Sequence, residues 1–252
     1  MPLPALVKQA ASPGSIGFAI LCISLWALLV LLHRQRLAAW VLALSVSFYL
    51  VLAMPSTASL IVRSLPPFEI RQPDIGHLDT LVVFDGDNRV GRSRASMNAY
   101  ETMRPSSVVV IGEPWLVDAL VAGGISADKV ISDESPATTR DQVVWMKRRK
   151  LSHPTERTAV VASCLQMPRV AGLIEAAGLT VGLLPSPVDD LPTFTGPRRF
   201  APSYLALRMG RDAIYEHAAL AYYRWRGWIP APLSASASSS GTTVLTAAAC
   251  IE

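Results

Sequence analysis

The first quarter of the chain contains two long apolar runs. Residues 16–32 and residues 37–54 contain no Asp, Glu, Lys or Arg, and only residues 33–36 separate them. A helix needs about 17–25 mostly apolar residues to cross a bilayer, where each backbone polar group must be paired within its own segment. The pattern predicts two transmembrane helices, at about 15–33 and 37–55, in an N-terminal region that ends at residue 62.

Two other interpretations of these runs are a signal peptide and a pair of buried core helices. A signal peptide fits poorly because a second apolar run follows at once, and core helices fit poorly because no polar face is present. The turn His33-Arg34-Gln35-Arg36 is basic, which favours a cytoplasmic position for it. Both ends of the hairpin then lie on the periplasmic side, although Arg63 and Arg71 there weaken the argument.

From residue 78 onward, short apolar runs alternate with helix-like stretches. Strands are predicted at 78–84, 107–111, 129–131, 158–162 and 179–184, and helices at 92–103, 114–121, 138–150, 167–177 and 203–225. This alternation is typical of an α/β fold with a mainly parallel, Rossmann-like sheet between two layers of helices. We expect a connector at 63–77, the α/β domain at 78–229 and a disordered Ala/Ser/Thr-rich tail at 230–252.

The composition of the chain limits the kinds of partner that we expect it to bind. The chain is 51% hydrophobic and has a formal net charge of +4. An apolar, slightly basic chain suits a position beside anionic lipid or a phosphorylated ligand. Nucleic acid is not expected as a partner, because no basic patch interleaved with aromatic residues is present. The three cysteines, Cys22, Cys164 and Cys250, form no CxxC motif, so we expect neither a disulfide framework nor a zinc site.

Polar residues follow the first predicted strand. Ligands of parallel sheets bind at the carboxyl ends of the strands, and Asp85-Gly86-Asp87 lies at such an end. Two carboxylates there could hold a metal ion or act as general acid and base. The alternative is an ordinary turn, because Asp and Gly are common turn residues. The loop has no GxGxxG dinucleotide signature.

The segment from Ser163 to Arg169 joins a predicted strand to a predicted helix. Pro168 fits the first helical turn, and free N–H groups there favour an anion that Arg169 could bind through two hydrogen bonds. Cys164 at a helix start could have a lowered pKa and act as a nucleophile. The alternative is a capped helix with a small buried cysteine.

A third polar segment, Glu134 to Asp141, precedes the helix predicted at 138–150. Either Thr138 or Thr139 is a plausible N-cap, and Asp141 suits the positive end of the helix dipole. Helix capping is therefore the simple interpretation of this segment, and ligand binding is the other.

Taken in order, these segments resemble the SanA/ElyC/YdcF-like family of bacterial envelope proteins over about residues 78–228. The family's first loop and the Arg-Ala of its next helix are similar to Val82–Asp87 and Arg94-Ala95. Its E-x-x-S-x-N-T-x-E-N and T-S-x-x-H-M-x-R-A segments are similar to Glu134–Gln142 and Ser163–Val170, and its closing G-W to Gly227-Trp228. The hairpin ahead of the domain is similar to the ElyC-type arrangement.

The resemblance implies a multi-pass protein of the bacterial inner membrane that acts in cell-envelope biogenesis. We expect its domain to bind a phosphorylated, lipid-linked or nucleotide-like ligand, with hydrolase or transferase activity; cofactor and metal stay open. Candidate catalytic residues are Asp85, Asp87 and Glu134. Candidate ligand-binding residues are Gly86, Arg94, Gly112, Thr139, Arg140, Asp141, Ser163, Gln166 and Arg169.

One departure from the family pattern supports a different function. Gln166 stands where the family has histidine, and glutamine cannot take up or release a proton near neutral pH. The alternative is therefore a non-catalytic scaffold or regulator of cell-wall or polysaccharide synthesis, with a membrane protein as partner.

Overall fold

The structure is a computed structural model that describes residues 15–70, 78–86, 89–149, 151, 157–187, 196–230 and 243–245. The chain forms two compact units. The first comprises Met1–Ser64 and Pro192–Ala218, and the second comprises Leu65–Leu191 and Ala219–Glu252. Each unit therefore contains two stretches of chain that are distant in sequence.

The first unit begins with two antiparallel apolar helices, α2 (Ile16–Leu31) and α3 (Gln35–Leu52). The Phe18 and Phe48 rings lie 6.1 Å apart, and the Tyr49 hydroxyl donates to the carbonyl of Ser15 at 2.9 Å. The helix α3, with 18 residues, is long and apolar enough to cross a membrane, whereas α2 is apolar but has 16 residues. Most of their large apolar side chains are exposed.

A short helix that the sequence did not predict, α4 (Pro55–Arg63), follows α3 almost directly. Pro55 occupies its first turn, where the missing N–H of proline costs no hydrogen bond. Ala58 and Val62 are fully buried. The first unit is completed by the 3-10 helix η2 (Gly196–Phe200) and by the part of α9 (Tyr204–Trp225) that ends at Ala218.

The second unit is built on a sheet of five parallel strands in the order β4-β3-β2-β5-β6. The strands are β2 (Thr80–Phe84), β3 (Ser107–Ile111), β4 (Val130–Asp133), β5 (Thr158–Ser163) and β6 (Gly182–Ser186). The strands β2 and β5 are buried along their whole length, as expected for central parallel strands covered on both faces. The predicted α/β class with a parallel sheet is confirmed.

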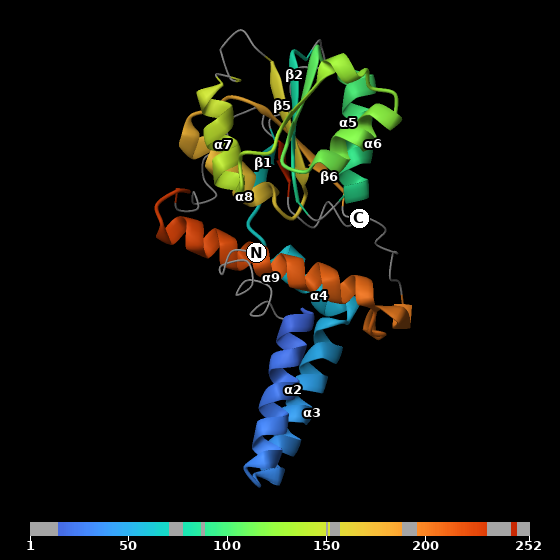
Figure 1. Ribbon diagram of the computed structural model, residues 1–252, viewed down its shortest axis with the longest axis vertical. Coiled ribbons are helices and arrows are strands. Elements are labelled where there is room, and N and C mark those ends of the chain that lie inside the picture. Colours follow the sequence, from blue (N-terminus) through green and yellow to red (C-terminus); the bar gives the residue numbers. More distant parts are fainter. Residues whose placement is uncertain are drawn as a thin grey trace. The chain divides into compact units, whose positions relative to one another are not determined.

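Helices cover both faces of the sheet (Figure 1). One face carries α5 (Arg89–Met103) and α6 (Pro114–Ala122), and the other carries α7 (Thr139–Arg148) and α8 (Met167–Ala177). Alternate strand residues such as Leu81 and Val83 point to the same face, and they form one buried cluster with Ala99 and Leu116 of α5 and α6. A short 3-10 helix, η1 (Ala127–Lys129), leads into β4.

A second, two-stranded sheet lies in the regions predicted to be connector and tail. The strand β1 (Phe68–Ile70) pairs antiparallel with β7 (Thr243–Leu245), with Phe68 opposite Leu245. The tail was predicted to be disordered, and this three-residue strand is its part within the described residues beyond Pro230. The chain thus returns to the second unit within α9, at Ala219.

Candidate functional site

The order of the strands places a reversal at the centre of the sheet. From β2 the chain continues to β3 and β4 on one side, and then crosses to β5 and β6 on the other side. In open α/β sheets the crevice at such a reversal, outside the carboxyl ends of the strands, is the usual ligand site. The residues at this point are Asp85 and Gly86 after β2, and Cys164 to Gln166 after β5.

Gly86 and Gln166 are in direct contact across the reversal. A Cβ atom on Gly86 would lie 2.4 Å from Gln166 Nε2, and the φ of Gly86 is +144°. That backbone conformation favours glycine. Gln166 is half-buried and precedes the first residue of α8. A residue with a side chain at position 86 would therefore displace Gln166.

Asp85 is held by the helix α7. Gln142 Nε2 donates a hydrogen bond to Asp85 Oδ1, and Gln142 is only 1% exposed. The other amide atom, Gln142 Oε1, is buried and has no hydrogen-bond partner within the described part of the chain. Buried amide oxygens are nearly always paired, so this atom is an acceptor suited to a water molecule or a ligand hydroxyl group.

Arg169 connects the helix starts of α7 and α8. Its Nη1 donates to Thr139 Oγ1 at 2.6 Å, and its guanidinium carbon lies 5.5 Å from the ring centroid of Tyr223. Only 3% of its surface is exposed. These contacts indicate that Arg169 positions Thr139, whereas the sequence indicated that Arg169 binds phosphate.

Together these contacts close a ring around the reversal, which we call the strand-end cluster. Its three contacts are Asp85 with Gln142, Thr139 with Arg169, and Gln166 with Gly86. Sequence reasoning found all of its members except Gln142, which it passed over in favour of Asp141. The signal was the spacing, because Thr139 and Gln142 are three positions apart and share one face of a helix.

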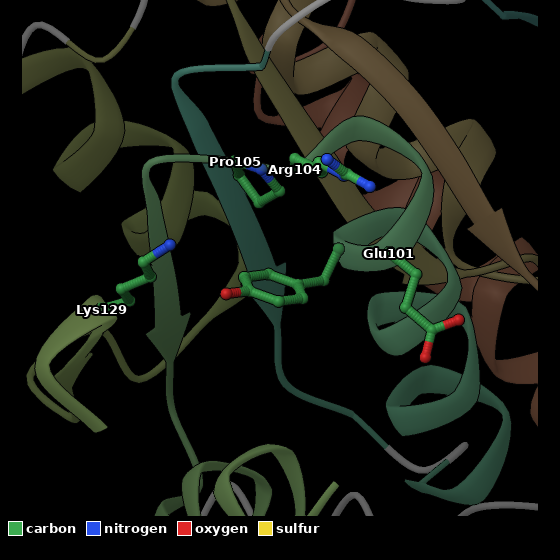
Figure 2. Close-up of a pocket in the computed structure, with 5 residues that line it drawn as sticks. Glu101, Arg104, Pro105 and Lys129 are labelled. Carbon is green, nitrogen blue, oxygen red and sulfur yellow. The ribbon is translucent and has the colours of Figure 1, made fainter. Parts of the chain in front are cut away.

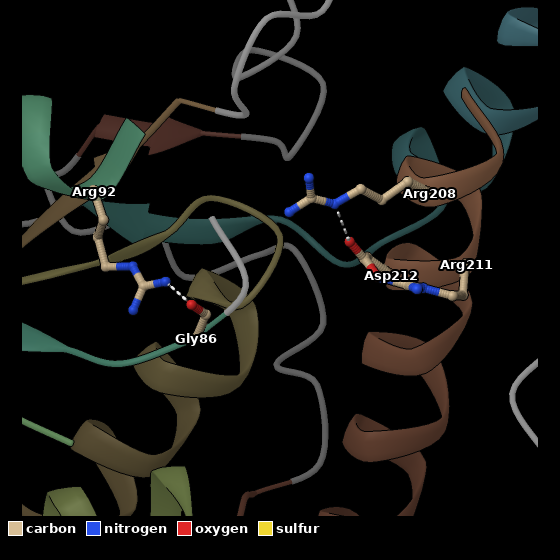
Figure 3. A network of polar contacts seen from close by, with 5 residues as sticks. All are labelled: Gly86, Arg92, Arg208, Arg211 and Asp212. Carbon is tan, nitrogen blue, oxygen red and sulfur yellow. Dashed lines mark hydrogen bonds and ion pairs between the residues drawn. The ribbon is translucent and has the colours of Figure 1, made fainter. Parts of the chain in front are cut away.

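A different arginine of α5 contacts the loop that follows β2. Arg92 is fully buried and donates from Nη1 to the carbonyl of Phe84 at 2.6 Å and from Nη2 to the carbonyl of Gly86 (Figure 3). Arg94, the predicted ligand residue, is exposed. The helix begins at Arg89, earlier than the predicted start at residue 92, which places Arg92 in its first turn beside the loop that follows β2.

The remaining predicted residues differ in their surroundings. Asp87 lies outside the described residues, Glu134 is exposed, and Ser163 is buried at the end of β5. Asp141 belongs to the cap of α7, because its N–H donates to Thr138 Oγ1 at 3.2 Å and its carboxylate accepts from the same hydroxyl at 2.7 Å. The capping interpretation therefore holds for this residue, with Thr138 as the N-cap.

Arg140 and Gly112 also lie near the carboxyl ends of the strands. The Arg140 guanidinium carbon is 4.3 Å from the ring centroid of Trp228, and Arg140 is half-buried near the start of α7. Gly112 follows β3, and a Cβ atom there would lie 2.4 Å from Asp85 Cβ. Gly112 thus provides the space that the Asp85 side chain occupies.

An acid that the sequence analysis missed lies at the end of β4. Asp133 accepts hydrogen bonds from the Ser135 N–H at 2.9 Å and from Trp145 Nε1 at 2.7 Å. Hydrogen bonding from the Ser135 side chain, and then from the Ser135 N–H and Trp145, lowers the pKa of Asp133 below its ordinary value, because these bonds stabilise the carboxylate. Asp133 therefore stays ionised near neutral pH.

The N–H groups at the start of α8 are paired, not free as the sequence analysis predicted. Met167 N donates to the Cys164 carbonyl at 3.2 Å, Arg169 N donates to the Gln166 carbonyl at 3.0 Å, and Pro168 has no N–H. The prediction of free N–H groups for an anion at this helix start is wrong, because a tight turn already satisfies them.

The expectation of no disulfide is also wrong. Cys164 is fully buried and disulfide-bonded, whereas Cys22 is free. Cys164 is therefore not a thiolate nucleophile.

Counting free thiols tests whether Cys164 is in a disulfide bond. We expect purified protein that is denatured in N-ethylmaleimide to gain one adduct, on Cys22, because an intact disulfide does not react. After reduction it should gain three adducts. Mass spectrometry of the intact protein gives the count, and a Cys22→Ser variant should lower each value by one. Three adducts before reduction would contradict the disulfide.

A hollow elsewhere on the second unit lies away from this cluster. It is lined by Tyr100, Glu101, Arg104, Pro105 and Lys129, and Lys129 Nζ lies 5.7 Å from the Tyr100 ring centroid (Figure 2). These residues precede β3 and β4, so they lie at the amino ends of the strands.

In the described part of the chain no three His, Cys, Asp or Glu residues are grouped to hold a metal ion.

The fold and the cluster together define an α/β domain with a polar site at the carboxyl ends of its parallel strands. No family model, no curated protein and no solved structure matches this chain.

Proposed function

We propose that this chain is an envelope-biogenesis protein of the SanA/ElyC/YdcF-like type, anchored in the bacterial inner membrane by α2 and α3. Its Rossmann-like domain binds a phosphorylated ligand that is lipid-linked or nucleotide-like. The observation that carries the proposal is the strand-end cluster, which joins β2, α7 and α8. Ligands bind at this point in sheets of this topology.

The chemistry of the cluster suits a ligand that carries both hydroxyl and phosphate groups. Asp85 and Gln142 Oε1, which has no hydrogen-bond partner among the described residues, are acceptors for hydroxyl groups, such as those of a sugar. Arg140, in the first turn of α7, combines its own charge with the positive end of the helix dipole and so favours phosphate. Arg169 supports this helix start through Thr139.

Two observations support a membrane anchor with the domain on the periplasmic side. The helix α3 has the length and composition of a membrane span. Cys164 is disulfide-bonded, and disulfides are typical of oxidising compartments and rare in the cytosol. The basic turn at residues 33–36 supports the same orientation. A cytoplasmic position of this turn puts both ends of the hairpin, and so the domain, on the periplasmic side.

A second candidate function, a non-catalytic scaffold or regulator, is favoured by the residues of the cluster itself. Within the described residues the cluster contains no histidine, and Asp85 is its one acid. A general acid–base reaction usually needs a group that exchanges a proton near neutral pH, and Gln166 cannot. Turnover of a phosphorylated substrate by purified protein, lost in Asp85→Asn, would exclude this candidate.

Ligand binding is tested with farnesyl phosphate, a short polyprenyl phosphate. We expect it to raise the melting temperature of the full chain in lipid nanodiscs, whereas farnesol should not. Arg140→Ala should weaken binding by about tenfold or more, because a charge-assisted hydrogen bond is worth about 1.5–3 kcal/mol. Arg148→Ala, an exposed arginine on the same helix, is the matched control and should bind normally. Equal affinity of both variants would overturn the proposal.

A further inference from the structure

The end of α3 leads directly into a layer of short helices in the first unit. We call this layer the platform; it comprises α4, η2 and the residues of α9 from Tyr204 to Ala218. The helix α3 has 18 residues. At a rise of about 1.5 Å per residue, a helix of this length nearly equals the thickness of the bilayer core, about 30 Å. If α3 crosses the bilayer, α4 begins where the hydrocarbon ends.

Three contacts hold the platform together. The Ser203 N–H donates to the Ala53 carbonyl at 2.8 Å, a Cβ on Gly210 would lie 3.7 Å from Ala58 Cβ, and His217 Nε2 lies 2.9 Å from Ser64 Oγ. Their order along both helices shows that α4 and α9 run side by side in the same direction. The pair is thus fixed to the end of α3 by direct contacts.

The platform keeps large apolar and aromatic side chains exposed. Leu60 on α4 is 69% exposed, Phe200 on η2 is 53% exposed and Tyr204 on α9 is 76% exposed. Aromatic side chains with a polar group, such as tyrosine, are enriched at the boundary between lipid and water. Exposed residues of this kind are therefore suited to the headgroup layer.

The charge of the platform has the sign that anionic lipid attracts. Residues 55–64 and 196–218 contain five arginines and two acidic residues. Asp212, one of the acids, already forms ion pairs with Arg211 at 2.7 Å and Arg208 at 4.0 Å (Figure 3). Arg198 and Arg199 of η2 are exposed. Basic segments beside a membrane span are attracted to anionic headgroups.

We infer that the platform lies in the headgroup layer of the membrane that α3 spans, and that it binds anionic phospholipid through η2. This inference rests on the proposed membrane anchor, and it adds a lipid-binding surface to it. The occupant is the lipid surface itself, because the platform is continuous with a membrane-spanning helix.

The depth of single labels tests the inference in the full chain. In a Cys22→Ser background, bimane is attached to Leu60→Cys, Tyr204→Cys, Leu44→Cys in the middle of α3, or Arg148→Cys on α7. Nitroxide on the lipid headgroup should quench the labels at 60 and 204 about twofold more than the label at 148. Nitroxide deep in the acyl chain should quench the label at 44.

The outcomes separate this inference from the anchor on which it rests. Quenching at 44 without quenching at 60 and 204 would overturn the platform and leave the anchor intact. No quenching at 44 would overturn the anchor itself. Either result is informative even if one labelled variant folds poorly, because positions 60 and 204 report on the same layer from different helices.

The lipid preference is tested by neutralising the arginines of η2. Headgroup quenching at position 204 should increase when phosphatidylglycerol replaces part of the phosphatidylcholine in the nanodiscs. The double variant Arg198→Gln/Arg199→Gln should lose most of this increase. Arg94→Gln/Arg148→Gln removes the same charge from exposed positions on α5 and α7 and should retain it. Equal responses of the two double variants would overturn the role of η2.

Discussion

Replacing Arg92 by alanine is expected to destabilise the second unit by about 3 kcal/mol, because buried acceptors then lose a charged donor. Arg92 is fully buried and donates to the carbonyls of Phe84 and Gly86, so its loss also leaves a cavity beside β2. The measurement is the unfolding midpoint of the full-length protein in detergent, followed by near-ultraviolet circular dichroism.

Two further variants make this result specific. Arg94 is an exposed arginine of the same helix, and Arg94→Ala should change stability by no more than about 0.5 kcal/mol. Arg92→Lys keeps the charge but not the fork of donors, and should be intermediate. It also provides a measurement if Arg92→Ala does not fold. Similar losses for Arg92→Ala and Arg94→Ala would show that the contacts of Arg92 contribute little.

Gly112→Ala should be the most damaging of the conservative changes near the strand-end cluster. The new Cβ would lie 2.4 Å from Asp85 Cβ and 2.6 Å from Asp85 Cγ, so Asp85 must move from its position beside Gln142. The φ of Gly112 is +117°, which adds strain for any residue with a side chain. We expect a loss of about 2–4 kcal/mol in the free energy of unfolding, measured by denaturant titration.

The variant Gly124→Ala distinguishes the steric clash with Asp85 from the backbone strain of a positive φ. Gly124 has a similar φ of +106°, but a Cβ there would meet no atom of the described residues within 4 Å. Its loss should be about 1–2 kcal/mol, from backbone strain alone. The difference between the two variants then measures the crowding at Asp85. Equal losses would show that Asp85 can move at no cost, and the cluster would be less rigid than its contacts indicate.

The regular part of the fold could be predicted from the sequence because its signals are local. The strand at 107–111 and the helix at 167–177 match β3 and α8 at both ends. The last strand was predicted at 179–184, whereas β6 is Gly182–Ser186. The left-handed turn at Gly178 is followed by apolar residues that continue the same pattern, and hydrophobicity alone does not show where pairing begins.

Other elements depend on contacts that no local pattern reveals. Pro55 indicated the end of an apolar run, but proline also begins helices, and α4 starts there. The strands β1 and β7 are short and are separated by more than half of the chain. Their pairing is a long-range property, as is the disulfide of Cys164.

Within the site, sequence reasoning identified the loops but not always the residue. The carboxyl ends of the strands follow from the α/β pattern, and the residues that come together there are Asp85, Gly86, Thr139, Gln166 and Arg169. Which arginine of α5 contacts the loop depends on where the helix starts, and with the start at Arg89 it is Arg92 that donates to the carbonyls of Phe84 and Gly86. The side chains that pair internally could not be distinguished from those open to a ligand.

The interleaving of the two units has a consequence for synthesis of the protein. Ribosomes produce a chain from its N-terminus, so α2, α3 and α4 are made first, but their partner residues 196–218 follow all five strands of the large sheet. Ala58 and Val62 of α4, which are buried in the folded protein, therefore stay exposed while the second unit is translated. A fragment that begins at residue 65 would keep every residue of the second unit but would leave residues 196–218 without α4, their partner in the first unit.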